Sequence, residues 1–232
     1  MFSPKDTAIE RGWPGRIDGD RVIQLAAQTL QAFFTGGGGA REHAEYPLVD
    51  VELRAPVLFP PGLRIFSAFE AGGPRFEFGN TASVKGPEEK VRVPKGSSHL
   101  DLGLALAAVI GADGEIGGFT LANDWTARDL PDAKSRDFAT SIGPVLVTPD
   151  EFSGDTGTIV ARVNGEERSR ANLAGLAYGW PELVGHAALN TRLRPGDLIL
   201  AEAPSGQGPP LRSGDLVELE VEGIGVLRNR VR

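Results

Sequence analysis

The segment at residues 123–144 reads NDWTARDLPDAKSRDFATSIGP. It concentrates charged residues between two apolar runs, at 118–122 and 143–148, and the second run, which begins at the end of the segment, is typical of a β-strand. Charged groups that a fold buries need partners. The charges of this segment are therefore expected either to form a hydrogen-bonded structural network or to line a pocket. Asn123 and Asp124 could also simply make a turn.

The composition narrows the classes of protein to which the chain can belong. Its 232 residues suit one large domain, or a small cap and a main domain. The formal net charge is −7 and the pI is about 5.1, with no basic block, which argues against binding to nucleic acid or to anionic membranes. The chain has no cysteine, which excludes disulfides, thiolate nucleophiles and zinc-thiolate sites.

The first residues, MFSPKDTAIERGWPGR, scatter charges and contain no apolar core of a signal peptide. No window approaches 18 consecutive apolar residues, so no membrane span is expected. The expected location is the cytoplasm.

The content of 31 glycines and 17 prolines indicates many turns and a β-rich fold. Near the start, residues 14–24 predict two short strands around an Asp-Gly turn, and the spacing of apolar residues over 22–34 predicts a helix that ends at the glycines 36–39. Residues 49–57 alternate as a strand does. We therefore expect a small N-terminal cap at 1–55 and a main domain at 56–232.

In the main domain, the apolar run 104–110 is either a buried strand or a helical segment by periodicity alone. Asn164-Gly165 predicts a hairpin between strands at 158–163 and 166–169. Pro181 suits the first turn of a helix over 179–188. Further strands are expected at 143–148, 198–201 and 216–221.

Several segments, taken in order, resemble one family over about residues 55–232. They are VKGP at 84–87, an Asp-to-AAVIG block at 101–111, NDWTARD at 123–129, AKSRDFATSIGP at 133–144, VTPDE at 147–151, RVNGEERSR at 162–170, LRPGDLIL at 193–200, PSGQG at 204–208 and SGDLVELEVEGIGVLRNRV at 213–231. This ordered set resembles the fumarylacetoacetate hydrolase superfamily, in particular its single-domain members of the acylpyruvase and 2-hydroxyhepta-2,4-diene-1,7-dioate isomerase type.

The resemblance implies an α+β, β-rich fold, a mixed β-roll with a small N-terminal cap, usually built as a homodimer. It also implies hydrolysis, decarboxylation or tautomerisation of small 2-oxo or β-diketo acids. In such proteins Mg²⁺ or Mn²⁺ holds the 2-oxo-carboxylate of the substrate and stabilises the enolate that forms.

The metal site that the resemblance implies consists of two glutamates in the 101–111 block and one aspartate. Aligned on the end of that block, the glutamate positions hold Gly103 and Ala105, and only Asp124 remains. We therefore expect a degenerate site that binds no metal without ligand, since one carboxylate is a poor site. Glu202 is the one nearby glutamate that could compensate.

The resemblance also implies a His-Glu pair that activates water. Glu70 is a possible remnant of this pair, whereas none of the three histidines, His43, His99 and His186, falls on the expected position. Hydrolysis, which needs a base for water, is therefore disfavoured.

The resemblance assigns catalytic roles to Lys134 and Arg128, and contact with the substrate to Glu70 and Ser205. A threonine implied for the late segment is Ala203 here.

Two hypotheses remain open from the sequence. In the first, the protein is an enzyme that acts on a small oxo acid with an altered site, where cations alone could stabilise an enolate. In the second, it is a non-catalytic relative that keeps the fold, the dimer and a small-molecule pocket, which the coordinated loss of functional side chains favours.

Overall fold

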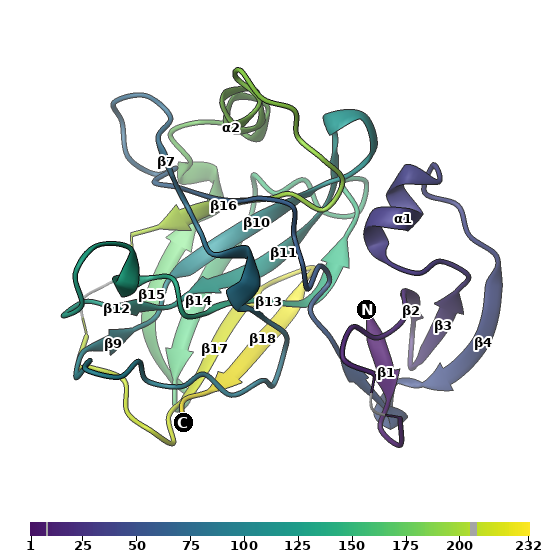
Figure 1. The fold of residues 1–232 in the computed structure, drawn as a ribbon, viewed down its shortest axis with the longest axis horizontal. Helices are drawn as coiled ribbons and strands as arrows, with labels where there is room; N and C mark the ends of the chain where they lie inside the picture. Colours follow the sequence, from purple (N-terminus) through teal and green to yellow (C-terminus); the bar gives the residue numbers. More distant parts are fainter. Residues whose placement is uncertain (8, 205–207) are drawn as a thin grey trace.

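The computed structural model describes residues 1–7, 9–204 and 208–232, and its centre is a curved seven-stranded sheet (Figure 1). In spatial order its strands are β7 (Phe76–Phe78), β6 (Leu63–Phe66), β16 (Leu198–Ala203), β10 (Leu104–Ile110), β11 (Ile116–Asp124), β13 (Thr140–Val147) and β8 (Val84–Lys85). Neighbours are antiparallel except for the parallel pairs β16–β6 and β13–β8. The apolar run whose conformation the sequence left open is thus the central strand β10.

A four-stranded antiparallel sheet packs against one face of the central sheet. It contains β15 (Glu166–Asn172), β14 (Thr158–Val163), β17 (Leu216–Val221) and β18 (Gly225–Arg230). The interface is the largest apolar cluster, to which Leu106, Phe119 and Leu219 belong. Complete burial of such side chains contributes about 1.5–3 kcal/mol each. The hairpin predicted at Asn164-Gly165 is confirmed, since both residues have the positive φ angles, 53° and 85°, that its turn requires.

The other face of the central sheet carries small and large apolar side chains. Ala105, Ala107 and Ala122 belong to a second apolar cluster, which also includes Phe34 and Val57. The helix α2 (Trp180–Ala187) confirms the prediction made from Pro181, which lies in its first turn. Short strands β9 (Leu100–Asp101) and β12 (Thr126–Ala127) pair beside the sheet. The 3-10 turns are η1 (Leu48–Asp50), η2 (Thr81–Ser83), η3 (Ala112–Gly114), η4 (Asp132–Ser135) and η5 (Leu173–Gly175).

The N-terminal part forms a separate lobe at the right of Figure 1. It contains β1 (Phe2–Pro4), β2 (Gly15–Asp18), β3 (Arg21–Leu25), α1 (Leu30–Thr35), β4 (Glu42–Pro47) and β5 (Val51–Leu53). A third, small apolar cluster, with Phe2, Val22 and Val51 buried, lies here. A division of the chain at residue 55 stays a prediction.

Two predictions for this lobe need correction. A helix over 22–34 is wrong, because Val22 and Ile23 pair with both β2 and β4 as part of β3. The helix begins only at Leu30, where the Thr29 side chain accepts a hydrogen bond from Ala32 N and caps it. The strand expected over 49–57 is limited to β5.

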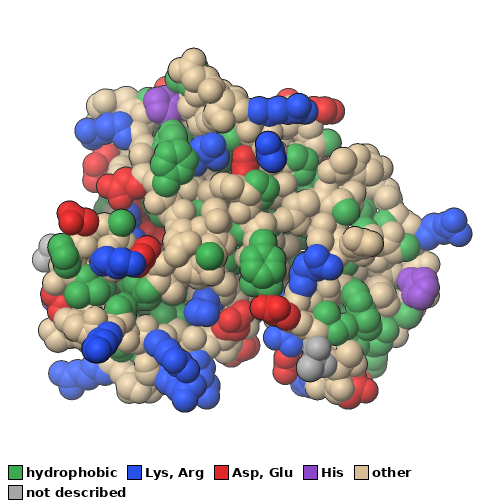
Figure 2. Space-filling model, in the orientation of Figure 1, with side chains coloured by type: hydrophobic (Ala, Val, Ile, Leu, Met, Phe, Trp, Pro, Cys, Tyr) green, Lys and Arg blue, Asp and Glu red, His purple; other side chains and the backbone are tan. Residues whose placement is uncertain are grey.

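The described helices are all too short or too polar to cross a membrane. On the face shown in Figure 2, Lys and Arg side chains are interspersed with Asp and Glu side chains.

Candidate active site

Asp124 is the last residue of β11 and is completely buried. Its Oδ1 accepts a hydrogen bond from Thr140 Oγ1 at 2.8 Å, across the β11–β13 pair. Its Oδ2 is also buried but accepts no hydrogen bond from the described residues. Neither Asn123 nor Asp124 makes a turn, because both belong to the strand. Instead, Asn123 Oδ1 accepts a hydrogen bond from Gly103 N at 2.9 Å.

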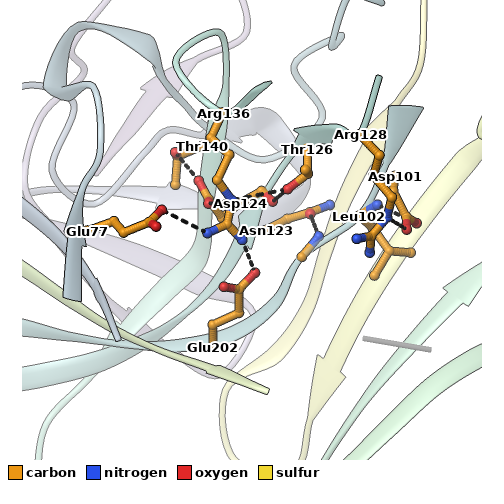
Figure 3. A network of polar contacts seen from close by, with 11 residues as sticks. Glu77, Asp101, Leu102, Asn123, Asp124, Thr126, Arg128, Arg136, Thr140 and Glu202 are labelled. Atoms are coloured by element: carbon orange, nitrogen blue, oxygen red, sulfur yellow. Dashed lines mark hydrogen bonds and ion pairs between the residues drawn. The ribbon is translucent and has the colours of Figure 1, made fainter. Parts of the chain in front are cut away.

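The charge that compensates Asp124 comes from Arg136, which directly follows η4 (Figure 3). Its Nε lies 3.1 Å from Asp124 Oδ2 and donates a hydrogen bond to Thr126 Oγ1 at 3.2 Å. Its Nη2 donates to Glu202 Oε1 in a direct ion pair. Its Nη1 lies 3.8 Å from Glu77 Oε2, on a side chain that is 77% exposed. One guanidinium thus lies among three carboxylates.

Glu202 reaches this cluster from β16, where it pairs with Ala105 of β10. The side chains of directly opposed residues in antiparallel strands lie side by side on one face, so Glu202 lies beside the small side chain of Ala105. A Cβ atom on Gly103 would lie 3.1 Å from Glu202 Oε1 and 2.4 Å from the backbone oxygen of Asp124. The carboxylate of Glu202 therefore occupies the space toward which a side chain at position 103 would point.

Burial raises the pKa of Asp124 from 3.8 to about 7. Arg136 opposes this rise by favouring the charged carboxylate, whereas the negative charge of Glu202 adds to it. The pKa of the Arg136 guanidinium is raised above its ordinary value: burial lowers it, but the charges of Glu202 and Asp124 outweigh that effect. The guanidinium is therefore a permanent cation in this cluster.

A second buried ion pair orients Arg128. Asp101, only 1% exposed, accepts hydrogen bonds from Arg128 Nε at 2.6 Å and from Arg168 Nη2 at 2.7 Å. Its Oδ1 also accepts from Leu102 N at 2.9 Å. Because Asp101 belongs to β9 and Arg128 directly follows β12, the pairing of these two short strands brings the ion pair together.

These groups surround a cavity of about 330 Å³ lined by Ser67, Glu70, Thr126, Arg128, Arg136, Glu202, Ala203 and Pro204. Larger hollows exist elsewhere, such as one of about 760 Å³ lined mostly by residues of the N-terminal lobe. We regard the smaller cavity as the candidate active site, because two guanidinium groups and two carboxylates converge on it.

Of the residues predicted from sequence, Arg128 and Glu70 line this cavity, and Asp124 contacts Arg136, which also lines it. Lys134 does not line it: its side chain is 75% exposed and its Nζ lies 2.5 Å from Asp137 Oδ2. Its catalytic role stays a prediction. Ser205, predicted to contact substrate, lies outside the described residues.

Asp129, the acid of the same segment, is bound to a neighbouring loop. It accepts hydrogen bonds from Ser97 Oγ and from Ser98 N and Oγ, and these hydrogen bonds lower the pKa of its carboxyl group. Trp125 is fully buried in the core. His186 lies on α2, with its ring 6.0 Å from those of Phe66 and Phe76. None of these three residues lines the cavity.

Sequence reasoning missed the central residue of the site, Arg136, and its partner Glu77. The signal available was the position of Arg136 in the quoted segment, two residues after Lys134. The role of Asp101 was also missed.

Within residues 1–7, 9–204 and 208–232, no group of three or more His, Asp or Glu side chains is arranged to hold a metal ion. Asp124 and Glu202 do approach one another, but the guanidinium of Arg136 lies between their carboxylates.

The strand-rich fold is that of a known family. Residues 67–232 match the model of the fumarylacetoacetate hydrolase C-terminal domain, and the chain belongs to this family. All the lining residues of the cavity fall within the matched region.

Individual relatives include isomerases and a tautomerase. The chain is 32% identical over 176 residues to the mitochondrial oxaloacetate tautomerase FAHD2A of Bos taurus, covering 65% of this chain and 56% of that protein. It is 37% identical over 169 residues to the uncharacterized protein MJ1656 of Methanocaldococcus jannaschii, covering 66% and 70%. The crystal structure of 5-carboxymethyl-2-hydroxymuconate delta-isomerase from Mycobacterium smegmatis superposes with a TM-score of 0.83 at 25% identity, covering 99% and 97%.

Proposed function

We propose that this protein catalyses keto–enol tautomerisation of a small 2-oxo acid. The observation that carries the proposal is that two guanidinium groups, of Arg128 and Arg136, and the carboxylate of Glu70 face one cavity. Relatives that act as an oxaloacetate tautomerase and as a hydroxymuconate isomerase support this reaction class. Both names describe movement of a proton within an oxo or hydroxy acid.

The chemistry needs a proton acceptor and a stabiliser of negative charge. A proton leaves carbon 3 of the substrate, the electrons of that bond form a C2–C3 double bond, and the carbonyl oxygen becomes an enolate. The same proton then goes to that oxygen to give the enol, or returns to carbon 3. No oxidant, reductant or water is consumed.

Glu70 is the group of the cavity suited to carry this proton. Its carboxylate has no hydrogen-bond or ion-pair partner within the described part of the chain, whereas Glu202 is held by Arg136. Arg128 and Arg136 supply fixed positive charge for the substrate carboxylate and for the enolate oxygen. Preorganised charge at the position where negative charge develops is commonly the largest contribution to such catalysis.

The test is the ketonisation of enol-oxaloacetate, followed by the loss of enol absorbance with and without protein. We expect a rate proportional to protein concentration, and we expect Glu70→Gln to lower kcat by about 100-fold or more, as loss of a general base does. Glu182→Gln, an exposed change on α2, serves as the matched control. A rate equal to that of buffer, with oxaloacetate and with acylpyruvates, contradicts the proposal.

One observation favours a second candidate, a small-anion binding protein without turnover. The positions of two implied ligand glutamates hold Gly103 and Ala105, and the remaining acids Asp124 and Glu202 both face Arg136. Binding of oxalate without any ketonisation would distinguish this function from that of an enzyme.

A further inference from the structure

The guanidinium of Arg136 lies where a metal ion would lie if Asp124 and Glu202 were its ligands. Its guanidinium lies against Asp124 and Glu202, two acids whose side chains come from different strands of the central sheet. A divalent ion bound to the same two carboxylates would have to displace this guanidinium. The residues present therefore fit a guanidinium and do not fit Mg²⁺ or Mn²⁺.

The surrounding backbone leaves no room for a ligand side chain at position 103, one of the two implied glutamate positions. A side chain at position 103 would collide with the backbone oxygen of Asp124, at 2.4 Å from its Cβ. Ala105 is fully buried and packs among apolar side chains. The carboxylate near position 103 belongs instead to Glu202, and the charge of Arg136 compensates it.

The guanidinium is nevertheless open to a ligand on one side. Arg136 lines the cavity, and its side chain is 26% exposed. Its Nε and Nη2 are held by Thr126 and Glu202, whereas within residues 1–7, 9–204 and 208–232 Nη1 has only the 3.8 Å ion pair with Glu77. Glu77 lies on the edge strand β7 and is mostly exposed, so an exposed pair of this kind contributes at most about 1 kcal/mol.

We propose that Arg136 is a fixed organic cation that replaces the divalent ion of this site and binds the carboxylate of a 2-oxo acid directly. The ligand carboxylate takes the place of Glu77 at Nη1, in the cavity that Arg128 also lines. A planar guanidinium suits a carboxylate, to which it donates two parallel hydrogen bonds. Asp124 and Glu202 hold the cation in place and do not touch the ligand.

This inference deepens the proposed function by naming the group that recognises the substrate, but it concerns binding and not turnover. Oxalate, a dianion that resembles a 2-oxo acid, is the probe. Its binding is measured by calorimetry in chelator and again with Mg²⁺. Binding of Mn²⁺ alone is measured by the loss of the free-ion signal in electron paramagnetic resonance.

We expect the wild-type protein to bind oxalate in chelator, within about twofold of its affinity with Mg²⁺, and to leave the Mn²⁺ signal unchanged. Arg136→Gln should weaken oxalate binding in chelator by about 10-fold or more, as loss of a charged hydrogen bond does. Arg136→Lys, which keeps the charge, should recover part of that loss. Arg21→Gln, an exposed arginine of β3 paired with Glu45, is the matched control.

A requirement for Mg²⁺ or Mn²⁺ in oxalate binding, tight binding of Mn²⁺ alone, or no oxalate binding at millimolar concentration overturns the inference. These measurements on the wild-type protein decide the matter even if Arg136→Gln fails to fold. If oxalate binds without metal but no oxo acid is turned over, the inference stands and the proposed function fails. Turnover that requires added metal supports the proposed function and overturns the inference.

Discussion

The guanidinium of Arg136 contacts the carboxylate of Glu202, 66 residues away in the chain, in the space beside Gly103. This ion pair joins the segment after η4 to the central sheet. It also explains why position 103 has no side chain, since a Cβ atom there would press on Asp124 and on Glu202.

Gly103→Ala should therefore destabilise the protein. The added Cβ would lie 2.4 Å from the backbone oxygen of Asp124, so β11 must shift, at a cost of about 1–3 kcal/mol. Urea unfolding measures the change. Gly185→Ala, inside α2 with no atom within 4 Å of its Cβ, is the control and should be neutral or stabilising by up to about 1 kcal/mol. Equal effects of the two changes would contradict the steric argument.

Asp101→Asn should destabilise the protein by about 3–5 kcal/mol, because it leaves the guanidinium of Arg168 buried without its carboxylate partner. It should also weaken oxalate binding, since Arg128 loses the group that orients it. Thermal unfolding and calorimetry measure the two effects. An Asp101→Asn protein that unfolds like the wild type would show that this ion pair does not support the site.

The stability of the protein should depend on the ionisation of Asp124. Its pKa in the folded protein, about 7, lies above the ordinary value of 3.8, so the folded state holds this proton more tightly than the unfolded chain. The contribution of Asp124 to the unfolding free energy therefore decreases as the pH rises from about 4 to about 7. The rise in pKa corresponds to about 4 kcal/mol.

Asp124→Asn removes this titration. Relative to the wild type, the variant should gain stability as the pH rises through that window, measured by urea unfolding at a series of pH values. Asp113→Asn, at the exposed turn η3, is the control for the loss of one carboxylate. A constant difference for Asp124→Asn would show that Arg136 keeps Asp124 ionised throughout.

Glu77→Gln should tighten oxalate binding by a factor of about two to five. The change removes the carboxylate that competes for Arg136 Nη1, and an exposed ion pair of this kind contributes up to about 1 kcal/mol. Calorimetry in chelator measures the affinity, with Glu182→Gln as a control for the loss of one surface charge. Weaker binding by Glu77→Gln would mean that Glu77 supports the ligand.

Lys134→Ala should change the rate of ketonisation and the stability only slightly. The side chain is 75% exposed and its partner Asp137 is three residues away, an arrangement that contributes less than about 1 kcal/mol. Steady-state kinetics of Lys134→Ala and Arg136→Gln, measured under the same conditions, show which of the two cations the reaction needs. A larger loss in Lys134→Ala would restore the catalytic role that sequence resemblance gives to this lysine.

The sequence predicted the features that depend on local chemistry. Asn164-Gly165 requires positive φ angles, so the hairpin could be placed within a residue or two. Pro181 located α2 for a similar reason. In contrast, Val22 and Ile23 fit a helical period and a strand equally well, and only their pairing with two neighbouring strands decides between them.

The site was predicted only in part, for the same physical reason. Alignment within one short block places Gly103 and Ala105 at the two implied glutamate positions. The contact between Arg136 and Glu202 could not be predicted, because these residues meet through the three-dimensional arrangement of β16, β10 and β11. A contact between two residues 66 positions apart leaves no periodic pattern in the sequence from which it could be predicted.

The close approach of Gly103 to the carbonyl of Asp124 also restricts how this site can change by single substitutions. A glutamate installed at position 103 meets the β11 backbone before it can offer a ligand, and it adds a third acid beside a single guanidinium. Removal of Arg136 first leaves Asp124 and Glu202 facing one another without a counter-charge. Both single changes, a side chain at position 103 and removal of Arg136, are therefore expected to destabilise the protein. Steric contact at position 103 and the ion pairs of Arg136 together limit which side chains these two positions can hold.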